Sequence, residues 1–158
     1  MGWDVELRFL VCSSSWKNGA QGTLYRQGYL STAVDRTVRV RIIGERARLT
    51  VKGRKTDGAA TRFDYEIPLK DAEFMLVHLC LQPILEKTRY KLDHRGVSWD
   101  IDEFHGANEG LVIAEVELGV SGTMPELPEW VGDDVTEDHR YASSRLAERP
   151  FTSWSGNS

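Results

Sequence analysis

The sequence predicts an α+β domain in which β-strands are in the majority and form a meandering antiparallel sheet or barrel. Three observations support this prediction. Many segments alternate apolar and polar residues, turn-forming residues separate several of these segments, and helical signals are few. A length of 158 residues favours a single domain with room for a hydrophobic core.

The strands are predicted from the period of two that places alternate side chains on opposite faces of a sheet. Turn-forming glycines follow several of these segments, at Gly44, Gly58 and Gly96. This spacing suits connections between neighbouring antiparallel strands. The predicted strands cover residues 4–11, 27–30, 37–43, 48–52, 62–67, 88–92, 97–102 and 111–118.

Two further segments are predicted to be helical. In the first, Asp71 is the expected N-cap, apolar residues continue from Phe74 to Leu81, and Pro83 marks the end. The second lies between residues 136 and 150. Helices are therefore a minority of the expected fold.

Composition and charge argue against several classes of protein. A formal net charge of −4 argues against a nucleic-acid partner, since duplex binding usually requires a broad basic face. No apolar run approaches the roughly 20 residues that span a bilayer, so no membrane partner is expected. The start of the chain lacks the pattern of a secretory signal, which makes the cytoplasm the expected location. Cys12 and Cys80 lack metal-ligand spacing and are expected to be buried thiols.

Charged residues recur on single faces of the predicted strands. Residues i and i+2 of a strand point to the same side of the sheet, and several segments place charges in that register. The aligned charges are Asp4, Glu6 and Arg8; Arg39 and Arg41; Arg62, Asp64 and Glu66; Lys87 and Arg89; Asp100 and Asp102; and Glu115 and Glu117. A sheet with one solvated face shows the same alternation. Periodicity therefore leaves open whether these charges face water or an enclosed cavity.

A cavity lined by both signs of charge would suit a polyanion together with a metal ion. Arginine and lysine bind phosphoryl oxygens, and a guanidinium group can bind two of them at once. Carboxylates repel phosphate unless a hard cation lies between them, and Mg²⁺ and Mn²⁺ prefer such oxygen ligands. The accumulation of aligned charges therefore indicates a site for a metal-bound polyphosphate.

A set of short stretches between residue 4 and about residue 150 has the order of a known family. They are Asp4-Val5-Glu6-Leu7-Arg8-Phe9-Leu10-Val11, Gln27-Gly28-Tyr29-Leu30, Arg39-Val40-Arg41, Leu49-Thr50-Val51-Lys52-Gly53, Glu86-Lys87-Thr88-Arg89-Tyr90, Ala114-Glu115-Val116-Glu117-Leu118 and Pro128-Glu129-Trp130-Val131-Gly132-Asp133-Asp134-Val135-Thr136. In this order they resemble the CYTH domains, also called triphosphate tunnel metalloenzymes. Each stretch alone is a weak signal, whereas the ordered set is specific.

The resemblance implies a closed antiparallel tunnel barrel of eight strands with a few flanking helices. One such domain is expected over residues 1–150, and residues 151–158, which are rich in serine, are expected to form a flexible tail. The family implies metal-dependent hydrolysis of a triphosphate, and the bacterial branch that the chain resembles commonly cleaves inorganic tripolyphosphate to pyrophosphate and phosphate. Mg²⁺ or Mn²⁺ is the expected cofactor. Tripolyphosphate or another small triphosphate is the expected ligand, and a homodimer is the expected assembly.

The resemblance also implies roles for individual side chains. Glu115 or Glu117 would orient the attacking water through a metal ion, and Lys87 with Tyr29 is a second candidate for steering the water. The implied metal ligands are Asp4, Glu6, Asp64, Glu66, Glu115 and Glu117. The implied phosphate-binding residues are Arg8, Arg39, Arg41, Lys52, Arg62, Lys87 and Arg89.

Alternatives within the same fold stay open at this point. They are an adenylate cyclase acting on ATP, a thiamine triphosphatase, and a non-catalytic polyphosphate-binding module. The chain departs from the family pattern at Asp4 and Asp64, where glutamate is usual, and at Arg8, where lysine is usual. The stretch around residues 62–68 is two residues shorter than the pattern, which makes the assignments of Arg62, Asp64 and Glu66 ambiguous. The sequence shows no decisive base-recognition feature, which favours the inorganic substrate.

Overall fold

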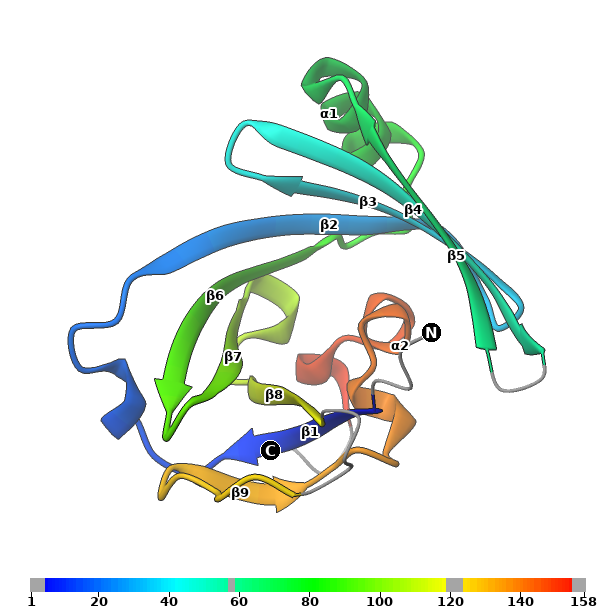
Figure 1. Cartoon of the computed structure of the whole chain (residues 1–158). Coiled ribbons are helices and arrows are strands. Elements are labelled where there is room, and N and C mark those ends of the chain that lie inside the picture. Colours follow the sequence, from blue (N-terminus) through cyan, green and yellow to red (C-terminus); the bar gives the residue numbers. More distant parts are fainter. Residues whose placement is uncertain (1–4, 57–58, 119–123, 155–158) are drawn as a thin grey trace.

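A computed structural model describes residues 5–56, 59–118 and 124–154. In these residues the strands form one antiparallel sheet of nine strands in the order β5-β4-β3-β2-β6-β7-β8-β1-β9. The sheet curves strongly, so that its two halves partly enclose a concave side (Figure 1). The strands are β1 (Val5–Val11), β2 (Gly22–Ala33), β3 (Arg36–Ile43), β4 (Arg46–Thr56), β5 (Ala59–Ile67), β6 (Leu85–His94), β7 (Val97–His105), β8 (Val112–Leu118) and β9 (Val131–Asp134).

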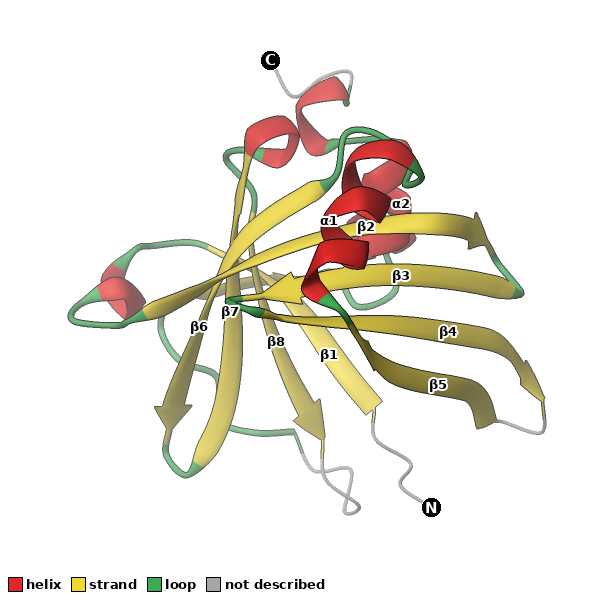
Figure 2. Ribbon diagram, turned by 90° about the horizontal axis from the view of Figure 1, so that it is seen from above, coloured by secondary structure: helices red, strands yellow, loops and turns green. Residues whose placement is uncertain are grey.

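The helices are short and lie on both sides of the sheet. Helix α1 (Leu69–His78) packs on the convex side against β3 and β4, and α2 (Ser143–Glu148) lies on the concave side against β2 and β6 (Figure 1). From above, β6, β7 and β8 cross the direction of β2–β5 steeply (Figure 2). The 3₁₀ helices are η1 (Ser15–Lys17), η2 (Gly106–Asn108), η3 (His139–Tyr141) and η4 (Phe151–Ser153). Among the described residues, no helix has the length and apolar character that crossing a bilayer requires.

The predicted α+β class and antiparallel sheet are confirmed, but the predicted closed eight-stranded barrel is wrong. Each predicted strand overlaps an observed strand, and β9 is an additional one. In the part of the chain that the structure describes, the sheet stays open, with β5 and β9 as its edges. Strand β9 pairs with β1 at Phe9 and Val11, so part of the edge of β1 that closure would require is already occupied.

Helix α1 begins before the predicted N-cap. Pro68 is the N-cap and Asp71 lies in the first turn, so the prediction of Asp71 as N-cap is wrong. The backbone N–H of Ala72 donates a hydrogen bond to the carbonyl of Pro68, which extends the helix toward its N-terminus. The carboxylate of Asp71 therefore lies near the positive end of the helix dipole, where acidic residues are favourable.

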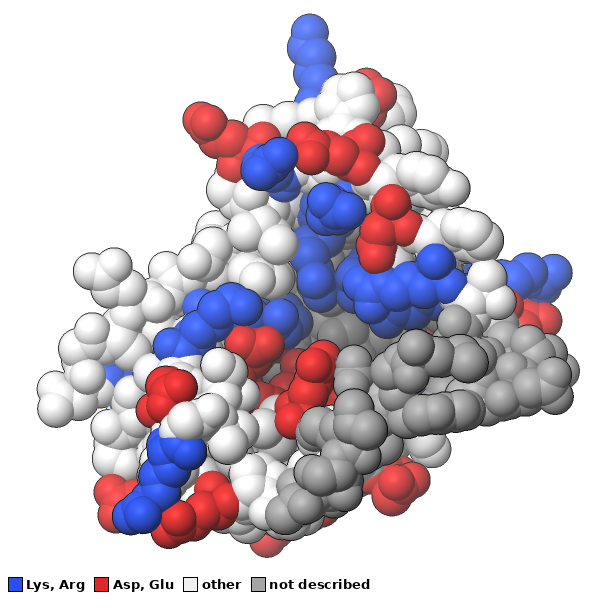
Figure 3. All heavy atoms as spheres, viewed as in Figure 1, with Lys and Arg blue, Asp and Glu red and all other residues white. Residues whose placement is uncertain are grey.

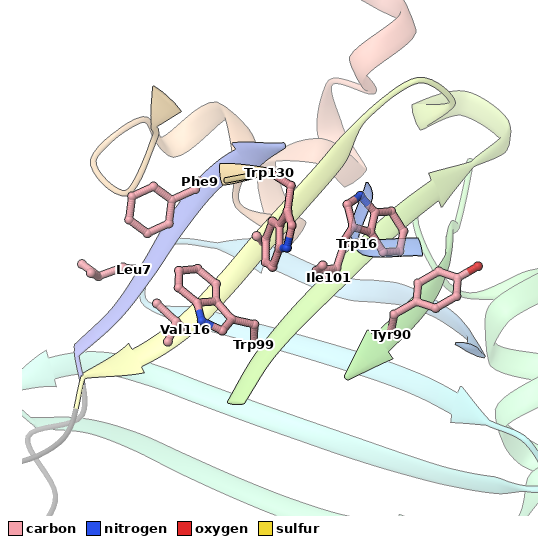
Figure 4. Close-up of a cluster of buried hydrophobic side chains, with 9 residues drawn as sticks. Leu7, Phe9, Trp16, Tyr90, Trp99, Ile101, Val116 and Trp130 are labelled. Atoms are coloured by element: carbon pink, nitrogen blue, oxygen red, sulfur yellow. The ribbon is translucent and has the colours of Figure 1, made fainter. Parts of the chain in front are cut away.

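The convex side of β1, β6, β7 and β8 is sealed by a hydrophobic cluster. Trp99 is fully buried, and its ring centroid lies 5.5 Å from that of Trp130 in an edge-on contact. Figure 4 shows these rings between Phe9 and Trp16. The members of the cluster are Leu7, Phe9, Trp16, Tyr90, Trp99, Ile101, Ala114, Val116 and Trp130. Because side chains alternate along a strand, this packing directs the charged neighbours of these residues to the concave side.

A second cluster packs α1 onto the convex side of β3 and β4. It contains Val40, Ile42, Ala47, Ala72, Leu76 and Cys80. The approach is close at Gly28 of β2, where an added Cβ would lie 2.9 Å from Cβ of Cys80. Cys80 is buried as predicted, whereas Cys12 is exposed. The prediction for Cys12 is wrong because β1 ends at Val11, which leaves Cys12 in the following loop.

A third cluster fills one end of the concave side. Its members are Tyr29, Leu85, Phe104, Leu111, Ile113, Val135, Tyr141, Leu146 and Ala147. Leu85, Phe104 and Ile113 continue the inward faces of β6, β7 and β8, so these faces change from charged to apolar along the strands. Phe151 and Trp154 pack against the same cluster. The apolar residues and α2 therefore cover one end of the concave side and leave the charged end for a ligand.

Candidate active site

A cavity of about 750 Å³ lies on the concave side of the sheet. Side chains from β1, β2, β3, β4, β5, β6, β7 and β8 line it, together with Ala142, Ser143 and Ser144 at the start of α2. The charged residues in its wall are Arg8, Arg39, Arg41, Lys52, Arg62, Lys87 and Arg89, with Glu6, Asp100, Glu115 and Glu117. The aligned charges of these strands thus face a shared cavity and not the bulk solvent alone.

The strand register separates the charges into two walls. Lys52 of β4 lies opposite Arg62 of β5, and Arg39 of β3 lies opposite Thr50 of β4. This side is the cationic wall, formed by Arg39, Arg41, Lys52 and Arg62.

Across the cavity, Glu6 of β1 lies opposite Glu117 of β8, and Arg8 lies opposite Glu115. This side is the carboxylate wall, formed by Glu6, Glu115 and Glu117. Figure 3 shows Lys and Arg gathered around the central hollow, with Asp and Glu below it.

In the cationic wall, burial and mutual repulsion disfavour the charged forms of the side chains. Burial, reinforced by the neighbouring charges of Arg39 and Arg89, lowers the pKa of Arg41 to about 10. Burial also lowers the pKa of Arg39 and of Lys52, and nearby arginines add to the effect. Nε of Arg39 is buried and has no hydrogen-bond partner among the described residues. A polyanion would supply the missing acceptor and counter-charge.

Neutral groups beneath this wall orient its guanidinium groups. Nε of Arg41 donates a hydrogen bond of 2.9 Å to Oε1 of the fully buried Gln27. The guanidinium carbon of Arg41 lies 5.2 Å from the ring centroid of Tyr25. Neither contact neutralises the charge, so the guanidinium group stays able to bind an anion.

In the carboxylate wall, burial and neighbouring glutamates disfavour the charged form of Glu6. Burial, reinforced by the charge of Glu115 and a hydrogen bond with it, raises the pKa of Glu6 to about 7. Glu117 acts in the same direction, while Arg8 partly opposes the shift. Glu115 lies 3.6 Å from Arg8 and 3.5 Å from Arg89, measured between nitrogen and oxygen. These carboxylates therefore repel one another in the absence of an added cation.

The donor set of the carboxylate wall fits a divalent metal ion chemically. Its ligand atoms are all carboxylate oxygens, which Mg²⁺ and Mn²⁺ prefer. A cation would also relieve the repulsion that adds to the effect of burial on the pKa of Glu6. Within the described residues, however, no group of three aspartate, glutamate, histidine or cysteine side chains is already arranged to hold a metal. Binding would therefore require the glutamate side chains to move together around the ion. Asp4 lies outside the described residues.

Lys87 and Tyr29 both line the cavity, and both side chains are buried. Lys87 is 2% exposed, and its Nζ donates a hydrogen bond of 2.8 Å to Oδ2 of Asp102. Burial lowers the pKa of Lys87, an effect that Asp102 opposes and that Arg89 and Arg41 reinforce. Burial raises the pKa of the Tyr29 hydroxyl, whereas Arg39 and Arg41 lower it.

The structure does not bring Asp64 and Glu66 to the carboxylate wall. Asp64 accepts hydrogen bonds from Oγ1 of Thr50 and, at 2.8 Å, from Nε of Arg62. These bonds hold the pKa of Asp64 below its ordinary value. Glu66 forms an ion pair of 3.2 Å with Arg46 on the exposed part of β4 and β5. Neither carboxylate is among the residues that line the cavity.

Asp100, Asp102 and Gln27 belong to the site but received no role from the sequence. Asp100 lines the cavity, whereas Asp102 and Gln27 lie buried beneath it and bind its cations. The alternation of charges along β7 indicated that Asp100 and Asp102 share a face, but gave no sign of their different depths. Gln27 belonged to a family-like stretch and was otherwise indistinguishable from a solvated polar residue.

Comparison with known proteins agrees with this geometry. The family model of the CYTH domain matches residues 4–150. An inorganic triphosphatase of Acetivibrio thermocellus is 44% identical over 151 residues, which cover 96% of this chain and 97% of that protein. An inorganic triphosphatase of Nitrosomonas europaea is 33% identical over 153 residues, with 91% and 96% covered. The crystal structure of the inorganic triphosphatase NE1496 has a TM-score of 0.71 and 31% sequence identity, and the match covers 90% of this chain and 96% of that one. The chain therefore belongs to the CYTH domain family.

Proposed function

We propose that this protein hydrolyses inorganic tripolyphosphate to pyrophosphate and phosphate, with Mg²⁺ or Mn²⁺ as its cofactor. The observation that carries the proposal is that one cavity combines two walls of opposite charge: a cationic wall in which Arg39, Arg41 and Lys52 form no ion pair with a described residue, and a crowded carboxylate wall. A short polyphosphate that carries metal neutralises both walls at once. The names of the two relatives, both inorganic triphosphatases, support the same reaction. The cytoplasmic location, the homodimer and the domain limits at residues 1–150 stay predictions.

Substrate binding is assigned to the cations of the cavity. The phosphate-binding set is Arg8, Arg39, Arg41, Lys52, Arg62, Lys87 and Arg89, all of which line the cavity. The guanidinium groups of Arg39 and Arg41 are held from below and direct their free N–H groups at the phosphate chain. Arg8 and Arg89 also approach Glu115, so they connect the phosphate-binding residues to the carboxylate wall.

The proposed metal ligands are Glu6, Glu115 and Glu117, together with Asp4. Asp64 and Glu66 stay predicted ligands that would have to leave their present partners. A bound divalent ion would neutralise charge on the phosphoryl oxygens, which is the main requirement of phosphoryl transfer.

The chain's own residues position the water and take up its proton. Water adds to a terminal phosphorus, the bond to the bridging oxygen breaks, and pyrophosphate leaves. Lys87 and Tyr29 are placed to hold this water by hydrogen bonds, since both reach the cavity from its buried side. Glu115 or Glu117 is the proposed acceptor of its proton. The cationic wall stabilises the charge that develops on the phosphoryl oxygens.

The lining of the cavity favours an inorganic substrate over a nucleotide or a thiamine ester. Among the described lining residues, Tyr29 is the one aromatic side chain, and it is 6% exposed. A base or thiazolium ring would therefore find little aromatic surface on which to stack.

The proposal is tested by incubating the purified protein with tripolyphosphate, ATP or thiamine triphosphate, each with Mg²⁺ or Mn²⁺. The expected result is metal-dependent release of phosphate, fastest with tripolyphosphate, and its loss in Glu117→Gln. Cyclic AMP as the main product from ATP would identify an adenylate cyclase, and a preference for thiamine triphosphate would identify a thiamine triphosphatase. Tight binding of tripolyphosphate without turnover of any substrate would identify a non-catalytic binding module.

A further inference from the structure

Beneath the cavity floor, one buried carboxylate binds two of the cations that reach the substrate site. The side chain of Asp102 is 3% exposed and does not line the cavity. Oδ1 accepts a hydrogen bond of 2.8 Å from Nε of Arg89, and Oδ2 accepts one of 2.9 Å from Nη2 of the same guanidinium group. Oδ2 also accepts the bond of 2.8 Å from Nζ of Lys87. Asp102 thus binds Arg89 with both oxygens and Lys87 with one.

The strand register explains how one carboxylate reaches both cations. Arg89 of β6 lies directly opposite Asp102 of β7, and Lys87 lies opposite Phe104, the next inward residue of β7. Lys87 is therefore the diagonal neighbour of Asp102, within reach of a long side chain. Phe104, with 3% exposure, closes the other side of Lys87, and the ammonium nitrogen lies 5.6 Å from the centroid of its ring. These contacts leave the ammonium group little freedom to reorient.

Asp102 is also the counter-charge of a crowded cationic group. Arg41, Lys87 and Arg89 all lie over the ring of Tyr25, at 5.2, 5.8 and 4.9 Å from its centroid. Although burial alone would raise the pKa of Asp102, hydrogen bonds from Arg89 and the charge of Lys87 hold this pKa below its ordinary value. The carboxylate is therefore ionised, and without it the three cations would repel one another in a buried place.

We propose that Asp102 is a positioning residue for hydrolysis, fixing Lys87 toward the attacking water and Arg89 toward the phosphate chain. This inference rests on the proposed function. A buried carboxylate near an anion site could have one of two effects, which kcat and KM distinguish. As a positioning residue, Asp102 raises kcat and does not raise KM, since it also holds Arg89 toward the phosphate chain. As a mere competitor of the substrate for the cations, it would weaken binding, and its removal would tighten binding at an unchanged kcat.

The test compares Asp102→Asn, Asp102→Glu and Glu103→Gln with the wild type. Asparagine keeps the shape but offers one acceptor and one donor to two cationic donors. Glutamate restores the charge on a longer stem. Glu103→Gln is the matched control, because Glu103 accepts a hydrogen bond of 2.9 Å from Lys17 and lies outside the cavity. Far-ultraviolet circular dichroism and thermal melting establish that each variant is folded.

The expected result for Asp102→Asn is a fall in kcat of about 100-fold, as can follow from the misplacement of a catalytic group by about 1 Å, with KM unchanged or raised. Asp102→Glu recovers part of kcat, and Glu103→Gln keeps the wild-type value. A folded Asp102→Asn variant with wild-type kcat, or one with a lower KM and unchanged kcat, would overturn the inference.

A readout that needs no turnover keeps this test separate from that of the proposed function. In protein labelled with ¹⁵N-lysine, the ammonium resonance of Lys87 is identified by its loss in Lys87→Arg. The restrained ammonium should give a sharp signal in the wild type, which shifts when tripolyphosphate is added and is lost in Asp102→Asn. If the wild type releases no phosphate but this signal behaves as expected, only the proposed function fails. An unchanged signal in Asp102→Asn would overturn the role of Asp102 whatever the activity.

Discussion

Replacing Arg41 by methionine separates the stability of the fold from its ability to bind a polyanion. The guanidinium group of Arg41 is partly buried among other cations, where burial and the charges of Arg39 and Arg89 lower its pKa. Methionine keeps much of the apolar stem and removes the charge. The variant should therefore bind tripolyphosphate poorly although the empty protein loses no stability.

The expected magnitude follows from two opposing contributions. At pH 7 the side chain is charged in the folded and in the unfolded chain, so the lowering of its pKa from the ordinary arginine value to about 10 opposes folding throughout. At about 1.4 kcal/mol per pKa unit this is roughly 3 kcal/mol. The hydrogen bond to Gln27 is lost in the variant, which costs about 2 kcal/mol for a charged donor. The net expectation is a gain of about 1 kcal/mol, or about 2 to 4 °C in Tm for a chain of this size.

The assay is thermal melting at low ionic strength with and without tripolyphosphate, together with the rate of phosphate release. Without ligand, Arg41→Met should melt at or slightly above the wild-type Tm. Its kcat/KM should fall by about 100-fold, as when one preorganised donor to the transition state is removed. Arg145→Met serves as the control, since Arg145 forms an ion pair with Glu148 and lies outside the cavity. An unliganded Arg41→Met variant that melts several degrees below the wild type would refute the reasoning.

Three further predictions concern the carboxylate wall and the core. Glu117→Gln should reduce the rate of phosphate release by about 100-fold. Tripolyphosphate without metal should still raise the Tm of this variant. Wild-type activity in the variant would show that Glu117 has no part in the mechanism. Because the folded-state pKa of Glu6 is raised from 4.5 to about 7, its contribution to the stability of the metal-free protein is complete below pH 4.5 and is lost as the pH rises through about 7. Urea unfolding at several pH values should show this loss in the wild type and a weaker one in Glu6→Gln, whereas equal slopes would contradict the assignment. Trp99→Ala should lower the free energy of unfolding by about 3 to 5 kcal/mol, and a urea midpoint close to that of the wild type would argue against its place in the core.

Alternation along the strands was sufficient to predict most of the sheet. Val40 and Ile42 pack under α1 while Arg39 and Arg41 face the cavity, as a period of two requires. Strand β9 could not be predicted in this way, because Val131–Asp134 is short and shows no alternation. It is a strand because β1 offers it a partner edge, a contact between segments far apart in the sequence. In the described residues the sheet stays open between β9 and β5, where the family resemblance implied closure.

The sequence predicted which face of each strand carries the residues of the candidate site, but not how deeply each residue is buried. A shared face brings Asp100 and Asp102 to the concave side of β7, yet Asp100 reaches the cavity and Asp102 lies beneath it. The difference arises because the inward face of β7 continues into the apolar packing around Phe104. Asp64 and Glu66 also face inward, but ion pairs with Arg62 and Arg46 hold them away from the carboxylate wall. Such pairings depend on side-chain positions that periodicity does not determine.

The central claim is that phosphate and metal meet between the two walls of one cavity. Its most direct test is a crystal structure of the Glu117→Gln variant with tripolyphosphate and Mn²⁺, in which anomalous scattering locates the metal. The account predicts the phosphate chain against Arg39, Arg41 and Lys52, with manganese between that chain and Glu6 and Glu115. Tripolyphosphate bound outside the cavity, or manganese at a place remote from Glu6 and Glu115, would contradict it.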